Sequence, residues 1–404
     1  MVRSAGVEPI YAERVVAEKA QPASSRMKIG LIIYGSIDTI SGGYLYDRKL
    51  VEHLRQQGDQ VEILSLPRRN YAGQLFDNIS GSLRRRIEEG GFDLLIQDEL
   101  NHPSLFWLNL GLKSQLHAPI VSIVHHLRCS EAHNRREKIL YRWVERRYLQ
   151  SVDAFIFNSA ATRRAVEALA GVRTPSIIAH PAGDQLYPAL TEAEVVSRAR
   201  QTGPLRFLFL GNVIPRKGLH VLLAALDRIK DLDWTLWIAG DLSADPGYAR
   251  SLKKQADRLE LGDRVTLLGI LGEDVLASRM RRSHLLVVSS FHEGFGIAYL
   301  EGMGFGLPAI ATTSGGASEI ITHGVNGFLA PPGDVDGLAA ILRWVLEDRR
   351  LLVTLSLAAL RRYTQQPTWE ETSERIRGFL LGLIDENRSK KLGSTGQNSY
   401  KGKK

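Results

Sequence analysis

Short apolar runs alternate with longer amphipathic stretches through residues 28–180, and the same alternation begins again at Leu205. The short runs have the composition of buried strands, and the longer stretches have helical periodicity. Such a chain forms βαβ units, whose parallel sheets are covered by helices on both faces. We therefore predict the α/β class, with two doubly wound, Rossmann-like domains in tandem and a cleft between them. The predicted strands are residues 28–34, 60–66, 93–97, 119–125, 153–158 and 176–180, then 205–210, 234–239, 264–268 and 285–290, with another that begins near Ala309. The helices expected between them include one near 103–117 and one near 217–230.

The domain boundary is expected within residues 190–204, because the chain from Tyr187 to Pro204 is polar and has no strand pattern. Both ends of the chain are polar and lack periodicity, which is typical of disordered segments. The predicted organisation is a disordered extension at 1–26, an N-terminal domain at 27–195, a C-terminal domain at 196–366 and a disordered basic tail at 389–404.

The net charge of +8 is concentrated near the ends of the chain. Residues 389–404 hold five lysines and no acid, and residues 1–26 hold four bases and three acids, so about two positive charges remain for the body. This balance, without interleaved aromatic residues, argues against nucleic acid as a partner. Cys129 is the single cysteine, which excludes an intrachain disulfide, and no apolar run has the length of a membrane span. We expect a cytoplasmic protein.

The stretch from Phe291 to Glu301 holds several candidate functional residues close together in the sequence. It follows an apolar strand, and it holds Glu293 on a loop with Gly294 and Gly296 before a helix that begins near Ile297. Glu301 falls in the first or second turn of that helix. Two carboxylates therefore flank the positive end of a helix, where backbone N–H groups bind anions. This arrangement suits a ligand with an anionic centre and hydroxyl-rich flanks, as a sugar nucleotide has.

A second loop, Gly211–Leu219, follows the first strand of the C-terminal domain and holds Arg216 and Lys217. A guanidinium binds two phosphate oxygens at once, and a lysine adds a point charge, so the pair suits a diphosphate leaving group. The alternative is that both are solvated surface charges. That alternative is weaker because the loop lies at the carboxyl end of a strand, where ligands bind in such sheets.

Two features of the N-terminal domain are weaker candidates. Gly42 and Gly43 lie between a strand and a helix and let backbone N–H groups approach a phosphate, although an ordinary tight turn explains them equally well. His125 and His126 end another strand. One of them could contact a sugar hydroxyl or a phosphate, and the equally good alternative is a hydrogen bond to a neighbouring strand. No nearby Asp, Glu or Cys set has metal-ligand spacing, so no metal site is predicted. Cys129 is expected to be an ordinary, partly buried thiol.

The stretch 135–148 is a basic helix with one apolar face. Packing against the sheet is the favoured interpretation, and peripheral contact with an anionic membrane through the N-terminal domain is the alternative. Two D-x-D pairs, at 231–233 and 334–336, are interpreted as turn and N-cap carboxylates rather than metal ligands.

The ordered motifs of the second half resemble those of the retaining GT-B glycosyltransferases of family four, the group 1 glycosyltransferases. The central match is the E-x7-E pair of Glu293 and Glu301, and the resemblance extends over residues 28–388. The surrounding motifs, in the family's order, are Arg216-Lys217-Gly218, Gly306-x-Pro308, Gly315-Gly316-x-x-Glu319 and Gly324-x-Asn326-Gly327.

The resemblance implies a role for each candidate residue. Arg216 and Lys217 would bind the donor diphosphate together with the backbone N–H groups of Phe295, Gly296 and Ile297. Glu301 would hold the ribose and Glu293 the transferred sugar, while Gly42 and Gly43 would approach the phosphates and His125 the sugar. Members often have an acid after that histidine; here His126 follows, so which of the two acts is left open. Residues 367–388 would form a helix that crosses back to the N-terminal domain.

The implied reaction is transfer of a sugar, of the hexosyltransferase type, from a nucleoside-diphosphate donor with UDP or GDP to an acceptor hydroxyl. Configuration would be retained through an oxocarbenium-like state, without a metal or another cofactor. The acceptor would be a glycan, a glycolipid or a lipid-linked intermediate of a cell-envelope polysaccharide. Two alternatives are a sugar-nucleotide epimerase of the same fold and a non-catalytic GT-B subunit; the intact basic and acidic motif residues argue against the second.

Overall fold

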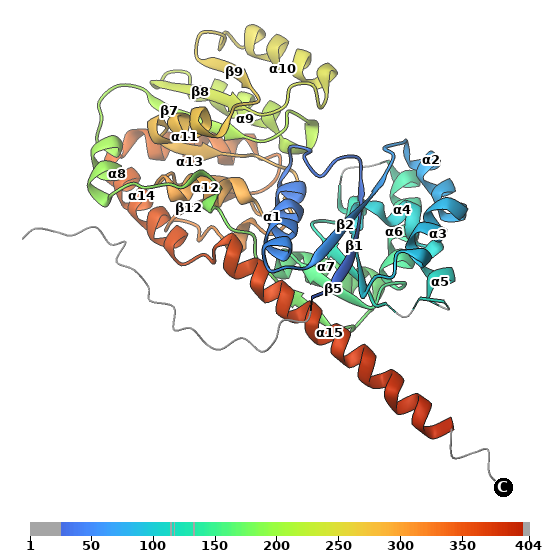
Figure 1. Ribbon diagram of the computed structural model, residues 1–404. Helices are drawn as coiled ribbons and strands as arrows, with labels where there is room; N and C mark the ends of the chain where they lie inside the picture. Colours follow the sequence, from blue (N-terminus) through green and yellow to red (C-terminus); the bar gives the residue numbers. More distant parts are fainter. Residues whose placement is uncertain (1–25, 114, 117, 132–133, 399–404) are drawn as a thin grey trace, which may run out of the picture.

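The computed structural model of the chain describes residues 26–113, 115–116, 118–131 and 134–398 (Figure 1). It contains two six-stranded sheets, one in each half of the chain, and every strand pair is parallel. The predicted α/β class and two-sheet architecture are confirmed. The predicted extension at 1–26 lies outside the described residues, apart from its last residue.

The first domain contains a sheet of order β2-β1-β3-β4-β5-β6. Alternate residues of β1 enter two different apolar clusters: Ile29, Leu31 and Ile33 pack on one face, and Ile32 packs on the other. Both faces are therefore covered, as a parallel sheet requires. The strands are β1 (Lys28–Tyr34), β2 (Gln60–Leu66), β3 (Leu94–Asp98), β4 (Ile120–Val124), β5 (Ala154–Phe157) and β6 (Ser176–Ile178). The helices are α1 (Gly42–Gln56), α2 (Tyr71–Leu75), η1 (Phe76–Ile79), α3 (Gly81–Glu89), η2 (Glu99–Asn101), α4 (His102–Leu105), α5 (Leu108–Leu112), η3 (Arg128–Ser130), α6 (Arg135–Leu149), α7 (Ala160–Ala170) and η4 (Asp184–Leu186).

The second domain contains a sheet of order β12-β11-β10-β7-β8-β9 around one continuous apolar core. Its strands are β7 (Leu205–Leu210), β8 (Trp234–Ala239), β9 (Val265–Gly269), β10 (Leu285–Val287), β11 (Ala309–Thr312) and β12 (Gly327–Ala330). Its helices are α8 (Glu192–Ala199), η5 (Pro215–Lys217), α9 (Leu219–Asp227), α10 (Pro246–Arg258), α11 (Glu273–Arg282), α12 (Ile297–Gly304), η6 (Ala317–Glu319), α13 (Val335–Glu347) and α14 (Arg349–Thr364). The order places β7 beside β10, so the two loops that carry the predicted donor residues are neighbours.

The helix expected after β7 begins two residues late, because Gly218 interrupts it. Gly218 has a φ of 67°, and a Cβ there would lie 2.0 Å from the backbone oxygen of Ser289. Arg216 and Lys217 therefore belong to the short turn η5 and not to α9. The single helix expected at 103–117 is likewise divided into α4 and α5.

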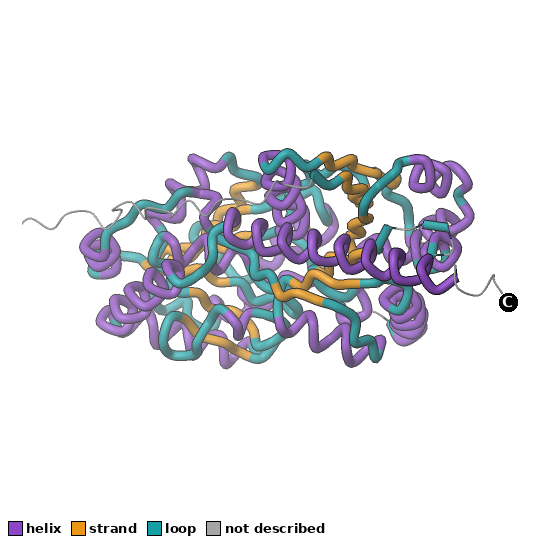
Figure 2. The backbone as a smooth tube through the Cα atoms, turned by 60° about the horizontal axis from the view of Figure 1, so that its bottom comes forward, coloured by secondary structure: helices purple, strands orange, loops and turns teal. Residues whose placement is uncertain are grey.

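Helix α15 (Trp369–Asn398) leaves the second domain and packs along α1 of the first (Figure 1). In Figure 2 it is the long helix that runs across the front of the molecule. Several side-chain contacts attach it to the first domain, and two of them involve charged partners on or next to α1. Glu374 bonds to His53 at 2.9 Å, and Arg377 forms an ion pair at 2.8 Å with Asp59, whose side chain is fully buried.

The prediction that residues 389–404 form a disordered tail is wrong for residues 389–398, because α15 continues to Asn398. Extending an existing helix costs far less than nucleating one, so a polar segment joined to a docked helix stays helical. An ion pair between Lys390 and Glu386, one turn apart at 4.0 Å, supports the extension. The last six residues lie outside the described part of the chain.

Candidate functional site

The loops after β7 and β10 bring Lys217 and Glu293 into direct contact. The ammonium of Lys217 donates to both carboxylate oxygens of Glu293, at 2.9 and 2.8 Å, and the hydroxyl of Ser290 donates to one of them at 3.0 Å. Both ionic side chains are only 14% exposed. Burial would raise the pKa of Glu293, but the charges of Lys217 and Arg216 bring it down to about 2. The carboxylate is therefore ionised at any physiological pH.

Arg216 lies at the junction of the two domains. It donates to the backbone oxygen of His292 at 2.8 Å, and its Nε lies 3.2 Å from the carboxylate of Glu131 in the first domain. The same carboxylate bonds to His126 at 3.0 Å. Burial would raise the pKa of Glu131, but His126 and then Arg216 bring it to about 2. A basic side chain of each domain, His126 of the first and Arg216 of the second, therefore contacts one shared carboxylate.

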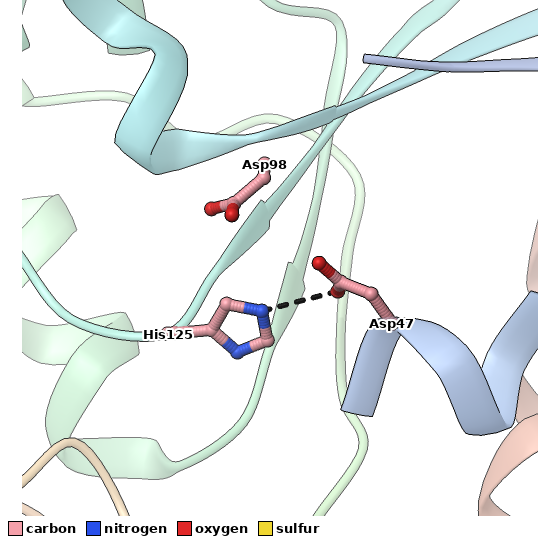
Figure 3. A group of neighbouring side chains, drawn as sticks. All are labelled: Asp47, Asp98 and His125. Atoms are coloured by element: carbon pink, nitrogen blue, oxygen red, sulfur yellow. Dashed lines mark hydrogen bonds and ion pairs between the residues drawn. The ribbon is translucent and has the colours of Figure 1, made fainter. Parts of the chain in front are cut away.

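His125 and His126 have different environments, although they are adjacent in sequence. Nε2 of His125 lies 3.1 Å from Oδ1 of Asp47, and Asp98 lies beside both, as Figure 3 shows. The ring of Tyr46 meets the His125 ring edge-on at 5.3 Å. His125 is thus held in a buried polar cluster of the first domain, whereas His126 faces Glu131.

The predicted glycines allow close approach at the same place. Ser41 caps α1, and the missing side chain of Gly43 lets the start of this helix lie against His125, since a Cβ there would be 3.0 Å from the ring. A Cβ on Gly42 would lie 3.5 Å from the side chain of Ile297 at the start of α12. The first turns of α1 and α12 therefore meet across the domain junction.

Helix α12 begins as the motif predicts. Gly296 caps it with a φ of 104°, and among the described residues no acceptor bonds to the backbone N–H of Phe295, Gly296 or Ile297. Glu301 follows one turn later and is 9% exposed. Burial, with a smaller effect of Glu273, raises its pKa to about 7, and no described residue hydrogen-bonds to its carboxylate. These free donors and this acceptor are available to a ligand.

Three glycines hold the Glu293 loop in place. The backbone oxygen of Glu293 accepts from Gly316 at 2.9 Å, and a Cβ on Gly315 would lie 1.8 Å from the same oxygen. A Cβ on Gly294 would lie 2.1 Å from the backbone oxygen of His125. The loop therefore contacts both domains through its backbone, which only glycine permits.

Glu319, which ends the Gly-Gly motif, is structural. Its carboxylate accepts from the backbone N–H groups of Ala160 at 2.9 Å and Ala161 at 2.7 Å, at the start of α7, and lies 3.2 Å from His180. A carboxylate of the second domain thus caps a helix of the first.

Of the D-x-D carboxylates, Asp334 caps α13, as predicted. Asp231 pairs with Arg343 at 2.8 Å.

The sequence showed no Asp, Glu or Cys set with metal-ligand spacing near the histidines, but the fold brings ionisable side chains from distant segments together. Asp47, Asp98 and His125 form one cluster, and Glu99, His102 and Glu145 form a second, each with side-chain oxygen and nitrogen atoms within 4.8 Å of one another. Asp47 and Asp98 were not among the sequence candidates. Asp98 carried a signal, because it is a polar residue at the carboxyl end of a buried strand. Asp47 lies one helical turn after Gly43, and that spacing alone says little.

The comparisons with known proteins agree with this geometry. Residues 191–364 match the family model described as glycosyl transferases group 1, and residues 46–182 match that of glycosyltransferase family 4. An uncharacterised glycosyltransferase of Methanocaldococcus jannaschii is 31% identical over 44% of this chain and 48% of its own length, so the chain spans about half of that relative. A phosphatidyl-myo-inositol mannosyltransferase of Mycolicibacterium smegmatis is 29% identical over 80% of this chain and 86% of its own.

Two solved structures share the fold over nearly the whole chain. Sucrose-phosphate synthase from Thermosynechococcus elongatus has a TM-score of 0.75 at 21% identity and covers 89% of this chain and 100% of its own. HepE from Anabaena, in complex with UDP-glucose, has a TM-score of 0.68 at 22% identity and covers 88% of this chain and 100% of its own.

Proposed function

The chain belongs to the group 1 glycosyltransferases with the GT-B fold, and on that premise we propose that it transfers a sugar from a nucleoside-diphosphate donor to an acceptor hydroxyl with retention of configuration. The observation that carries this proposal is that Arg216 and Lys217 bond to His292 and Glu293, in the loop that leads directly into the free N–H groups at the start of α12. These groups suit a diphosphate. The Glu301 carboxylate, one turn further on, suits the ribose hydroxyls.

Retention is supported by the state of Glu293. An inverting transferase needs a base that takes the proton of the acceptor hydroxyl, and such a base works best with a pKa near the working pH. With a pKa of about 2, and with both oxygens on Lys217, Glu293 is too weak a base for that task. In the proposed reaction Glu293 instead orients Lys217 and the sugar. The acceptor then attacks from the face that the diphosphate leaves, so that the leaving phosphate receives its proton.

UDP-glucose is the first donor to test, since HepE, which shares the fold, was solved with it. GDP sugars are the second choice, and a hexose is the proposed sugar. The donor needs no resident cofactor in this proposal, because Arg216, Lys217 and the helix end supply the positive charge.

The acceptor is proposed to be a glycan or a lipid-linked intermediate, and the surface of the first domain supports the lipid-linked class. Helix α6 packs through Val144 and Tyr148, as the favoured interpretation required, but other apolar side chains remain exposed. Trp143 is 52% and Trp107 65% exposed, and both lie against Phe106. Six exposed bases share α6: Arg135, Arg136, Lys138, Arg142, Arg146 and Arg147. Exposed aromatic and basic side chains together suit an anionic membrane surface. Among the described helices, none is long and apolar enough to cross a bilayer.

The donor is tested by thermal shift with a panel of UDP and GDP sugars, followed by release of nucleoside diphosphate. We expect one sugar nucleotide to raise the melting temperature of the wild type and Lys217→Ala to abolish that rise. Lys230→Ala is the matched control, because this lysine is 56% exposed and distant in sequence from the motif. No stabilisation by any sugar nucleotide would refute the proposal, and release of an epimerised sugar nucleotide without an acceptor would favour the epimerase. NMR of the product's anomeric proton tests retention.

The membrane contact is tested by sedimentation with phosphatidylglycerol vesicles and with phosphatidylcholine vesicles. We expect binding to the anionic vesicles only, and loss of that binding in Trp143→Glu. Trp344→Glu is the control, because Trp344 is 53% exposed on α13 of the second domain. Equal loss in both variants would contradict docking through the first domain.

A further inference from the structure

Three ionisable side chains from separate segments meet beneath the domain junction. Asp47 comes from α1, Asp98 ends β3 and His125 follows β4, and they are 0%, 2% and 8% exposed. One carboxylate oxygen of each aspartate and a ring nitrogen of the histidine lie within 4.8 Å of one another. Two carboxylates this close in a desolvated site repel each other unless a positive charge or a proton lies between them. The imidazole of His125 is in the position to supply it.

The hydrogen bonds fix the orientation of that imidazole. Nε2 lies 3.1 Å from Oδ1 of Asp47, while Oδ1 of Asp98 accepts from the backbone N–H of Leu100 at 3.0 Å. The backbone oxygen of His125 accepts from Asn158 at 2.8 Å. Within the described ranges, Oδ2 of Asp47 is buried and has no partner, and no residue bonds to Nδ1 of His125. Figure 3 shows Nδ1 on the side of the ring away from both carboxylates.

The position of the ring makes Nδ1 the useful atom. Gly43 at the start of α1 lies against the ring, and the backbone of Gly294 lies against the His125 backbone from the other domain. His125 therefore stands where the Glu293 loop meets the first domain. A protonated ring there would present one N–H to Asp47 and the other to a ligand of the junction.

Resting on the proposed function, we propose that Asp47, supported by Asp98, is a positioning residue that keeps His125 protonated with Nε2–H on Asp47, so that Nδ1–H donates to an oxygen of the bound sugar nucleotide. This assigns the ligand contact to His125 and not to His126, whose ring bonds to Glu131. Asp47 acts only through His125 and touches no substrate.

The groups around His125 determine in which direction its pKa is shifted. Burial lowers the pKa of the imidazole, but Asp47, then Asp98 and Glu99, raise it above its ordinary value. Tyr46 faces the ring with an uncharged edge, and Asn158 and Gly294 contribute only polar or backbone groups. Burial, and then the charge of Asp47, raise the pKa of Asp98 to about 7, and burial raises that of Glu99. Asp47 is thus the main charged partner of the ring, and removing its charge lowers the pKa of His125.

The experiment is an NMR titration of the full chain labelled at histidine carbons, with His125 assigned from the signal missing in His125→Gln. We expect Asp47→Asn to reduce the protonation constant of His125 at least tenfold and Asp47→Glu to restore part of it. The high-pH limb of kcat/KM should move down in pH by the same amount. Glu374→Gln is the control, because it removes a carboxylate bonded to a different histidine, His53. If Asp47→Asn does not fold, as judged by circular dichroism, Asp47→Ser removes the same charge and provides the same test.

An unchanged titration of His125 in a folded variant overturns the proposal, whether or not the enzyme is active. If the titration of His125 shifts but the high-pH limb of kcat/KM does not move, the proposed contact between His125 and the sugar nucleotide is overturned. The titration needs no turnover, so a protein that transfers no sugar but shows the shift refutes the proposed function and leaves the Asp47–His125 coupling intact. Broadening of the His125 signal by submillimolar Mn²⁺ would show that the three residues bind a cation, and would also overturn the proposal, because a metal displaces the proton from Nε2.

Discussion

The Lys217–Glu293 contact should be one of the strongest pairwise couplings in the second domain. Replacing Lys217 by methionine keeps the length of the side chain but leaves a carboxylate, 14% exposed, without its cationic partner. Removing one member of a buried ion pair costs about 3 to 5 kcal/mol, because the remaining charge stays desolvated. The pair in this protein lies at the lower end of that range, since Ser290 and Arg216 still stabilise the carboxylate.

The pKa of Glu293 gives an independent magnitude. The difference between its ordinary value of 4.5 and about 2 corresponds to about 3 kcal/mol of folding free energy. Because the folded-state pKa is the lower one, this stabilisation is present above about pH 4.5 and is lost as the pH falls toward 2. The contribution of Lys217 to the folding free energy has the opposite sign. Burial lowers its pKa, so its charge in the folded state costs stability. The net value of the pair is therefore below about 3 kcal/mol.

The assay is urea unfolding of four proteins: the wild type, Lys217→Met, Glu293→Gln and the double variant. We expect a coupling of about 2 kcal/mol in this cycle at pH 7.5, and a penalty for Lys217→Met that shrinks at pH 5, where the unpaired carboxylate takes up a proton. Lys230→Met, at a lysine 56% exposed, should change stability by less than about 0.5 kcal/mol. If the two single variants are additive, the contact does not exist in solution and the reasoning fails.

Three further predictions concern other parts of the molecule. Glu301→Gln should stabilise the free protein by up to about 3 kcal/mol at pH 8 but not at pH 4. The reason is that the pKa of Glu301 is raised to about 7, so the wild type loses stability as the pH rises above 4.5. The same substitution should weaken donor binding measured by calorimetry. Gly294→Ala should reduce transfer more than about tenfold, because its Cβ would lie 2.1 Å from a backbone oxygen, whereas Gly81→Ala, with open space around it, should keep full activity. Arg377→Ala should lower the melting temperature by several degrees, since its ion pair with the first domain is buried, while Arg388→Ala, at an arginine 55% exposed, should not.

The fold was predictable because its determinants are local. Most strands are short apolar runs between helical stretches, so their type and order followed from periodicity. Strand β12 is the exception, because it follows β11 after only the short turn η6, and it was not among the predicted strands. The errors lie where a contact from elsewhere in the chain decides the outcome. Gly218 delays α9 because its backbone packs on Ser289, and residues 389–398 stay helical because α15 is docked along α1. Neither neighbour is visible in the local sequence.

The same distinction between local and distant determinants applies to the candidate site. Arg216, Lys217 and Glu293 lie in motifs at the carboxyl ends of strands, and the sheet order brings the loops that carry them side by side. Asp47 was missed, because the three segments that form its cluster are far apart in sequence and carry no shared spacing.

The sequence also assigned each charge to the ligand separately, whereas the structure pairs them with one another. Lys217 is bonded to Glu293, and Arg216 shares Glu131 with His126. The basic side chains of the junction are therefore paired with protein carboxylates. The free N–H groups of Phe295, Gly296 and Ile297 have no such competitor among the described residues. Under the proposed function, a diphosphate would therefore bind to the unpaired N–H groups of α12, and a further contact with Arg216 would compete with Glu131. Since Glu131 belongs to the first domain and Arg216 to the second, that competition would couple donor binding to the contact between the two domains.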